Sequence, residues 1–428
     1  MNQTNPTETT GFAARAAALD ILQAALSGRA GIDGALAQPS LKALEPRDRG
    51  FARALAMATL RHIGPIDTAL QARLTKPPTE QVVNILRLGA AQLFVLKTPP
   101  HAAVGATVDL APPAFKGLVN AVLRNLSREP PQLADPDRLA PSWLYARWRA
   151  AYGEEGARQI AAMIAQEPPT DLSLKDAAQA EAQAAELEGQ VLPGGSLRTE
   201  RGGDVTGWPG FDKGGWWIQD AAAAIPVRLL DVQAGQTALD LCAAPGGKTL
   251  QLAATGASVT AVDRSAVRLK RVSENLTRTG LAAEVVEADG AAWADGRTFD
   301  AVLVDAPCSA TGTFRRHPDV LWVARPSDIA SLAAVQARLL DSAARRVKPG
   351  GVMVYCVCSL EPEEGEAQTE GFLARTADFA LLPVTAGEGG APEQSLRPDG
   401  TLRILPPHMP GGLDGFYIAR FRRAGDSG

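Results

Sequence analysis

The sequence predicts an all-α N-terminal domain, an α+β connector and a C-terminal α/β domain with a doubly wound parallel sheet. Three observations predict this order. Apolar residues recur at helical spacing, with no strand candidate, from Gly11 to about Leu126. The Pro- and Asp-rich stretch EPPQLADPD, residues 129–137, is typical of a linker. After Gln236, short apolar runs alternate with amphipathic segments, as in a βαβ array.

The N-terminal region has the pattern of a bundle of several short helices. One apolar stripe runs through residues 14–26 and another through residues 83–95. Proline and glycine interrupt the helical pattern at residues 31–40, 76–78 and 98–104. Each interruption is expected to end one helix and start the next.

The region between residues 141 and 220 carries weaker signals. It predicts a helix near Trp143 to Gln166, a short strand at Asp171 to Lys175, and then a helix rich in Ala, Glu and Gln. A Gly-rich stretch that ends in PGFDKGGWWIQD follows. We expect a small α+β connector here.

The C-terminal region predicts five strands with helices between them. The clearest helix has Ala266, Leu269, Val272 and Leu276 on one face and ends at Gly280. The alternating segment DGFYIARFRR predicts a final, antiparallel strand. The five strands are expected at TALDLC, SVTAVD, AEVVEAD, FDAVLVDAP and GVMVYCVCS. The expected domains are therefore residues 1–128, 129–220 and 221–428.

Length and composition limit the class of protein. At about 150 residues per domain, a chain of 428 residues should hold two or three domains. No apolar run approaches the roughly 18 residues that a spanning helix needs, and the first ten residues lack the features of a secretory signal. We expect a cytoplasmic protein with no membrane partner.

The net charge of −4 conceals an asymmetry along the chain. Residues 1–165 hold 18 Lys and Arg against 13 Asp and Glu, a balance of +5. The remainder holds 25 against 34, a balance of −9. A nucleic acid, if one binds, should therefore meet the N-terminal part.

The segment DLCAAPGGKT, from Asp240 to Thr249, follows an expected strand and opens a helix. Gly246 and Gly247 would let the backbone approach a ligand closely, and free N–H groups at a helix start suit an anionic or polar group. A P-loop requires glycine where Cys242 stands, and the dinucleotide pattern G-x-G-x-x-G is absent.

Acidic residues end the next two strands. Asp263 ends the second strand, where it could accept hydrogen bonds from ribose hydroxyls, and Asp289 ends the third, where it could hold an adenine amino group. Together with the small-residue turn, they match the layout of an S-adenosylmethionine site. The alternative is a tight turn whose neighbouring acids only cap helices.

Four cysteines lie in the C-terminal half: Cys242, Cys308, Cys356 and Cys358. Cys308 follows the fourth strand and Cys358 ends the fifth, so both can reach one pocket at the carboxyl edge of the sheet. Cys356 should point to the same face as Cys358, and it could be core packing or compete for a nucleophile's role. A zinc site would need a second pair at usable spacing or a nearby histidine, so we expect no metal.

Thiols beside a methyl donor suit one class of acceptor, carbon 5 of a pyrimidine. A thiolate that adds to carbon 6 makes carbon 5 able to attack a methyl sulfonium. The hydrogen on carbon 5 must then be removed and the thiol expelled, which gives a second cysteine a role. Nearby positive charge would favour a thiolate, and Lys248, Arg315 and Arg316 are candidates.

These motifs resemble those of the Sun (Fmu) family of RNA cytosine-5 methyltransferases, and within it the type that acts on bacterial small-subunit ribosomal RNA. The resemblance covers nearly the whole chain. PPHAAV and KGLVNAVLRN look like the family's NusB-like helical domain, and WWIQDAAAA resembles the entry to its Rossmann-like catalytic domain. The ordered catalytic motifs are DLCAAPGGKT, VDRSAVRLKRVSENLTRTG, EADG, DAPCSATGTFRRHPD and YCVCSLEPEE.

The resemblance implies a role for each matching residue. Cys358 would be the nucleophile, Cys308 would assist release, and Lys248 and Asp305 would border the target cytosine. The implied S-adenosylmethionine site consists of Cys242, Ala243, Ala244, Pro245, Gly246, Gly247, Lys248, Asp263, Asp289 and Asp305. The family usually has Thr directly before the nucleophile and a small residue before that. Here Val357 and Cys356 stand there, which puts the local hydrogen bonding of the thiol in question.

The resemblance also implies 16S ribosomal RNA as partner, bound by the N-terminal domain and the connector, and we expect a monomer. Two alternatives stay open. One is the same chemistry on another RNA, such as transfer RNA. The other is an RNA-binding, ribosome-assembly protein in which the methyltransferase fold is idle.

Overall fold

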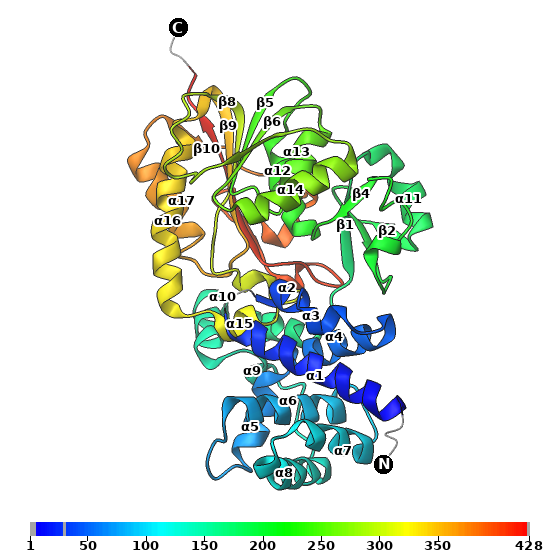
Figure 1. Cartoon of the computed structure of the whole chain (residues 1–428). Helices are drawn as coiled ribbons and strands as arrows, with labels where there is room; N and C mark the ends of the chain where they lie inside the picture. The colour runs from blue at the N-terminus through cyan, green and yellow to red at the C-terminus, as the bar shows by residue number, and fades with distance from the viewer. Residues whose placement is uncertain (1–5, 29–30, 426–428) are drawn as a thin grey trace. The chain divides into compact units, whose positions relative to one another are not determined.

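The computed structural model describes residues 6–28 and 31–425. Residues 1–5, half of the ten-residue stretch that lacks the features of a secretory signal, lie outside the described residues. The chain forms two compact units (Figure 1). Unit 1 consists of Met1–Glu167 with Phe314–Ala324, and unit 2 consists of Pro168–Thr313 with Arg325–Gly428. The division into three domains proposed from the sequence stays a prediction.

Unit 1 is helical throughout its described residues, as predicted. Residues of both predicted stripes lie in its core: Ile21, Leu22, Ile85, Leu86 and Leu88 are fully buried. The predicted breaks at residues 76–78 and 98–104 fall between helices or at the start of one. Residues 31–40 instead hold a short helix, α2 (Gly31–Leu36), and the start of α3 (Pro39–Lys42). Its helices are α1 (Pro6–Leu26), α2 (Gly31–Leu36), α3 (Pro39–Lys42), α4 (Pro46–Arg61), α5 (Ile63–Gln71), α6 (Glu80–Phe94), α7 (Pro100–Leu110), α8 (Lys116–Arg128), α9 (Pro136–Leu139), α10 (Ser142–Ala162) and α15 (Val320–Val323).

Unit 2 begins with a four-stranded antiparallel sheet in the order β2-β3-β1-β4. The predicted strand is β1 (Thr170–Leu174), and the predicted helix is α11 (Ala180–Glu186). The sequence did not predict β2 (Gly189–Val191), β3 (Leu197–Thr199) and β4 (Trp216–Ile218). Each has only three residues, too few to show alternation, and they are held by a tertiary core around Leu172, Leu197 and Trp216.

The main sheet of unit 2 has eight strands in the order β10-β12-β9-β8-β5-β6-β7, with β11 paired to β12. All five predicted strands are present and parallel, and the predicted last strand is antiparallel to its neighbour. The strands are β5 (Thr237–Leu241), β6 (Ser258–Asp263), β7 (Glu284–Glu287), β8 (Phe299–Asp305), β9 (Val347–Val357), β10 (Phe379–Leu381), β11 (Leu402–Ile404) and β12 (Phe416–Arg423).

Helices cover both faces of this sheet, as the doubly wound prediction requires (Figure 1). One face packs against α12 (Ala221–Leu230), α13 (Gly247–Ala254) and α14 (Ala266–Thr279), and the other against α16 (Pro326–Ala344) and α17 (Glu366–Arg375).

The predicted face of α14 is buried at Leu269, Val272 and Leu276. Ala266 is exposed, because it lies in the first turn of α14 before the helix meets the sheet. The helix ends at Gly280, as predicted.

The chain order of the strands reverses between β5 and β8. From β5 the chain proceeds outward through β6 and β7, then returns to β8 on the other side of β5 and continues to β9. In open α/β sheets the carboxyl ends of the strands at such a reversal form the ligand-binding crevice. Among the described residues, no helix is long and apolar enough to cross a membrane.

Candidate active site

The predicted site residues gather at the carboxyl edge of the main sheet. Cys242 follows β5, Asp263 and Asp305 end β6 and β8, and Cys358 follows the last residue of β9. Register places Asp305 opposite Cys356 on the neighbouring strand. The topology therefore brings residues from four strands to one edge.

The turn between β5 and α13 is tight. Cys242 adopts a left-handed φ of 65°, and its N–H and that of Ala243 both donate to the Val262 carbonyl, at 2.8 and 3.1 Å. Gly246 has φ 108°, and a Cβ there would lie 3.3 Å from Val272 of α14. Glycine is needed at this position both for its backbone angle and for the close helix.

Asp240, one of the last residues of β5, is a site residue that the sequence analysis missed. Its side chain is fully buried, and Oδ2 accepts a hydrogen bond of 2.6 Å from Thr249. Among the described residues, Oδ1 has no partner. Burial raises the pKa of Asp240 to about 7, although the Thr249 bond opposes this. An acid within an otherwise apolar strand was the signal that could have found it.

Asp263 is only 3% exposed and ties two loops together. Oδ2 accepts a hydrogen bond from Ala244 N at 3.2 Å, and Oδ1 accepts one from Ser265 N at 2.9 Å. The Arg268 guanidinium lies 3.6 Å from Oδ2 and also donates to the Ala244 carbonyl. Each carboxylate oxygen keeps a second lone pair, so the same group can organise the loop and accept a ligand hydroxyl.

Asp289 does not end the third strand, where the sequence predicted it. Strand β7 ends at Glu287, so Asp289 lies two residues beyond it and is exposed. Its carboxylate accepts a hydrogen bond of 3.0 Å from Ala291 N. Asp289 therefore stands in the loop after the third strand, and it starts a turn there.

Lys248 and Asp305 form the charged centre of the site. Lys248 Nζ lies 2.8 Å from Asp305 Oδ2 and 5.4 Å from the centroid of the Phe416 ring. Burial alone would lower the pKa of Lys248, but the Asp305 carboxylate and the thiols of Cys356 and Cys358 outweigh it, so the pKa of Lys248 is raised. The lysine is held as a cation.

Cys308 and Cys358 meet, as predicted from their places at the carboxyl ends of the fourth and fifth strands. Their Sγ atoms are 3.5 Å apart, and both side chains are partly exposed. The Gly312 amide donates to the Cys358 carbonyl at 3.0 Å, which ties the loop that carries Cys308 to the end of β9. The hydrogen bond to Cys358, followed by burial, raises the pKa of Cys308 well above its usual value.

The other two thiols differ in exposure, since Cys242 is partly exposed and Cys356 is buried. Cys356 is fully buried, and it packs with Cys358 against the same core, as the alternation predicted. Its Sγ donates to Asp305 Oδ1 at 3.4 Å. Burial and then the Asp305 carboxylate raise the pKa of Cys356, and the same two causes raise that of Cys242.

Of the three cations that the sequence suggested beside the thiols, Lys248 lies close enough to interact with Cys358. Arg315 and Arg316 belong to Phe314–Ala324, which groups with unit 1. Among the described residues, no group of three or more His, Cys, Asp or Glu side chains is placed to hold a metal ion.

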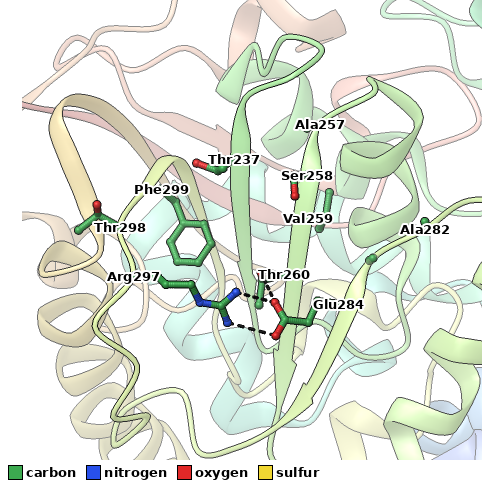
Figure 2. A pocket seen from close by; sticks show the side chains of 11 residues that line it. Thr237, Ala257, Ser258, Val259, Thr260, Ala282, Glu284, Arg297, Thr298 and Phe299 are labelled. Carbon is green, nitrogen blue, oxygen red and sulfur yellow. Dashed lines mark hydrogen bonds and ion pairs between the residues drawn. The ribbon is translucent and has the colours of Figure 1, made fainter.

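A separate hollow of about 440 Å³ lies at the opposite edge of the main sheet (Figure 2). It is lined by the first residues of four strands, among them Thr237, Ser258 and Glu284. Its cation, Arg297, pairs with Glu284 at 2.6 Å and with Asp295 at 2.7 Å. None of the predicted site residues lines it, so the site at the carboxyl edge is distinct from this hollow.

Comparison with known proteins agrees with this geometry. The family model "16S rRNA methyltransferase RsmB/F" matches residues 227–422, and the NusB family model matches residues 13–128. Ribosomal RNA small subunit methyltransferase B of Sodalis glossinidius is 40% identical over 90% of this chain and 92% of its own. The protein of the same name from Pseudomonas syringae pv. tomato is 40% identical over 95% of this chain and 96% of its own.

The chain belongs to the RsmB/F methyltransferase family.

Solved structures support the RsmB/F fold along the chain. The crystal structure described as PH0851 covers 99% of this chain and 100% of its own, with a TM-score of 0.79 at 22% identity, a likeness of fold. A methyltransferase homolog protein from Pyrococcus horikoshii is 28% identical, covers 68% of this chain and 98% of its own, and has a TM-score of 0.56. The predicted NusB-like domain and Rossmann-like methyltransferase domain are confirmed.

Proposed function

We propose that this protein uses S-adenosylmethionine to methylate carbon 5 of a cytosine in 16S ribosomal RNA, through a covalent bond between a cysteine and carbon 6. The observation that carries the proposal is the Cys308–Cys358 pair, with sulfurs 3.5 Å apart, at the carboxyl edge of the sheet. Methyl transfer to an oxygen or a nitrogen has no use for two adjacent thiols, whereas transfer to carbon 5 of a pyrimidine does.

The residues around β5 and β6 suit S-adenosylmethionine. The donor set combines the turn from Cys242 to Lys248 with the Asp263, Asp289 and Asp305 carboxylates, which can accept hydrogen bonds from hydroxyl and amino groups. Asp240 Oδ1, buried and without a partner among the described residues, adds a polar atom at the base of this turn. When bound, S-adenosylmethionine supplies a methyl group from a sulfonium centre.

The chain's own groups supply the rest of the chemistry. The Cys358 thiolate forms a bond to carbon 6, and the electrons of the 5,6 double bond make carbon 5 the nucleophile that takes the methyl group. A base then removes the proton from carbon 5. The 5,6 double bond re-forms as the carbon–sulfur bond breaks, and the thiolate leaves with the electron pair of that bond. Lys248 and Asp305 stand beside the thiols, where they can hydrogen-bond the polar groups of the base.

Cys358 fits the attacking role better than the other thiols. Burial raises the pKa values of Cys242 and Cys356, and a thiol that resists ionisation is a poor nucleophile. Cys358 lies close to the Lys248 ammonium. Cys308, in contact with Cys358, is placed to take part in removing the proton and in releasing the product.

The test compares single cysteine variants with S-adenosylmethionine and unmodified 16S ribosomal RNA. Cys358→Ala should form no covalent protein–RNA species, whereas Cys308→Ala should form one that accumulates because release is slow. Cys356→Ala, a packing control, should retain both steps. The readout is a shifted band on a denaturing gel that nuclease removes. A band in Cys358→Ala but not in Cys308→Ala would reverse the two roles.

The same assay tests the choice of RNA. The balance of +5 up to residue 165 and the match to the NusB family favour RNA binding by unit 1. Methyl transfer to 16S ribosomal RNA, with transfer RNA left unmodified, is the expected result. Transfer to transfer RNA alone would assign the other substrate, and no transfer to either RNA would favour the assembly-protein alternative.

A further inference from the structure

Glu364 is a fully buried carboxylate that the proposed chemistry does not use. It lies in the turn between β9 and α17, and it accepts four hydrogen bonds. Two come from Ser309, through its N–H at 2.9 Å and its hydroxyl at 2.5 Å. The others come from the Ser359 hydroxyl at 2.5 Å and from Gln336 Nε2 at 3.2 Å. None of these donors is a cation, so the carboxylate is held by hydrogen bonds alone.

The two serines stand directly after the two reactive cysteines. Ser309 follows Cys308, and Ser359 follows Cys358. Adjacent Cα atoms are only about 3.8 Å apart, so a serine that is fixed leaves its neighbouring cysteine little freedom. The two serine hydroxyls are also 3.1 Å from each other. One carboxylate therefore joins two chain segments that are 50 residues apart in sequence.

The same network holds the other side of Cys308. Gln336, which lies on α16, donates to Glu364 and also to the Pro307 carbonyl at 2.9 Å. The turn that carries Glu364 is itself anchored, because the Tyr355 hydroxyl donates to the Glu364 carbonyl at 2.6 Å. Cys308 is thus flanked by two residues whose positions depend on Glu364 or on its partner.

A buried carboxylate is costly to keep, and well-packed apolar residues usually stabilise a core at least as well. The Glu364 carboxylate instead contributes by positioning, because its hydrogen bonds are directional and hold the two segments at one separation. A neutral side chain of the same shape should preserve much of this, since the serine hydroxyls can rotate to accept from an amide.

We propose that Glu364 is the positioning residue that sets the separation of the Cys308 and Cys358 sulfurs. The importance of this separation for catalysis rests on the proposed function, in which both sulfurs act at the same cytosine. Because Glu364 holds both segments, its loss should slow both formation of the covalent adduct and its release. Loss of Ser359 alone should act mainly on the attack, and loss of Ser309 mainly on the release.

The first measurement needs no methyltransferase activity. Phenylarsine oxide bridges two nearby thiols, and its oxygen leaves as water without any redox change. The wild type should bind one equivalent through the two cysteines, and Cys308→Ala and Cys358→Ala should not. Glu364→Gln should bind like the wild type, whereas Glu364→Ala should bind about tenfold more weakly or worse. The matched control is Glu363→Ala, at the exposed neighbouring carboxylate.

The second measurement is steady-state methylation of RNA. Glu364→Ala should lower kcat about tenfold or more with little change in KM for RNA or in the affinity for S-adenosylmethionine, and Glu364→Gln should recover most of kcat. If Glu364 only stabilised the fold, Glu364→Ala would not lower kcat alone. Glu364→Gln would then have no selective loss of kcat to restore.

The outcomes separate the two proposals. A folded Glu364→Ala that binds the arsenical like the wild type overturns the positioning role. Weakened arsenical binding in that variant, with no adduct or methylation even in the wild type, overturns the proposed function and leaves the positioning role supported. If Glu364→Ala does not fold, the Ser309→Ala/Ser359→Ala double variant replaces it. Unchanged arsenical binding there also overturns the proposal.

Discussion

At the scale of single residues, Asp305 connects the cation to the thiols. One carboxylate oxygen accepts from Lys248 and the other from Cys356. The sequence comparison had marked Cys356 as a departure, since the family usually has a small residue there. In the structure, the Cys356 thiol is fully buried and donates a hydrogen bond to Asp305 at the carboxyl edge of the sheet. Its raised pKa keeps it protonated, as a donor must be.

Asp240 should make the stability of the protein depend on pH. Burial raises its pKa from the usual 3.8 to about 7, so the folded protein keeps a proton that the unfolded chain loses. This contribution is fully present below about pH 4 and is lost as the pH rises through about 7. Asp240→Asn cannot ionise, so its free energy of unfolding should fall less between pH 5 and pH 8, roughly the two sides of that titration.

Urea unfolding of the wild type and Asp240→Asn at these two pH values measures the difference. The control is Thr249→Val, which removes the hydrogen bond to Asp240 but leaves the carboxyl group able to ionise. Its free energy of unfolding should fall at least as much as that of the wild type, because the hydrogen bond that it removes holds the pKa of Asp240 down. Equal falls in the wild type and Asp240→Asn would mean that Asp240 does not titrate in this range.

At the scale of elements, Gly312 fixes how closely the loop that carries Cys308 approaches the loop that carries Gly415. A Cβ at this position would lie 2.1 Å from the Gly415 carbonyl oxygen, and that neighbour is backbone that cannot rotate away. Gly312 N donates to the Cys358 carbonyl, and Gly415 N donates to the Gly312 carbonyl at 2.8 Å. Any side chain at Gly312 must therefore push apart the loop that carries Cys308 and the loop before β12 that carries Gly415.

Gly312→Ala should lower the free energy of unfolding by roughly 1–3 kcal/mol, the range of overpacked sites. It should also lower kcat, because the Cys358 carbonyl loses its fixed neighbour. Gly296→Ala is the matched control, since a Cβ there meets nothing within 4 Å. Urea unfolding measures the loss of stability, and steady-state methylation of RNA measures kcat. A Gly312→Ala protein as stable as the control would show that the loops can shift without cost.

The elements also show what the sequence could and could not predict. Four of the five parallel strands were predictable because each carries a buried apolar run bounded by turn residues. The exception is β7, in which only two valines are partly buried. The order of the strands was not needed to expect Cys308 and Cys358 at one edge, since carboxyl ends of parallel strands always meet there. The three-residue strands β2, β3 and β4 were missed because tertiary contacts hold them.

In the candidate site, too, the sequence could not predict features that depend on tertiary contacts. Glu364 acts through burial and through partners as far away in sequence as Ser309, so no local pattern indicates its role. The places of Asp263 and Asp305 followed directly from the strand ends, whereas Asp289 lies beyond its strand because β7 is shorter than its apolar run suggested.

At the scale of the whole molecule, the chain of unit 2 passes once into unit 1. Phe314–Ala324 begins six residues after Cys308 and groups with the helices. Arg61 Nη1 donates to the Arg315 carbonyl at 2.6 Å, and Asp319 Oδ2 accepts from Ile32 N at 3.0 Å. Deletion of residues 1–128 would remove both partners, so it would disturb this segment as well as any RNA contacts of the helices. Single replacements separate these effects better.

Trp322 offers such a replacement. Its ring packs against the helical core, and Nε1 donates to the Leu60 carbonyl at 3.1 Å. Because the ring is only partly buried, Trp322→Ala should cost roughly 2–3 kcal/mol, less than a fully buried tryptophan. Hydrogen exchange should rise in α4 and in residues 314–324, while strands β5 to β9 stay protected. Trp293 is a partly buried tryptophan of unit 2. In Trp293→Ala, hydrogen exchange should rise in strands β5 to β9, while α4 and residues 314–324 stay protected. If Trp322→Ala instead raised exchange equally in the strands, the two units would unfold as one, and no replacement in the segment could test the helical unit by itself.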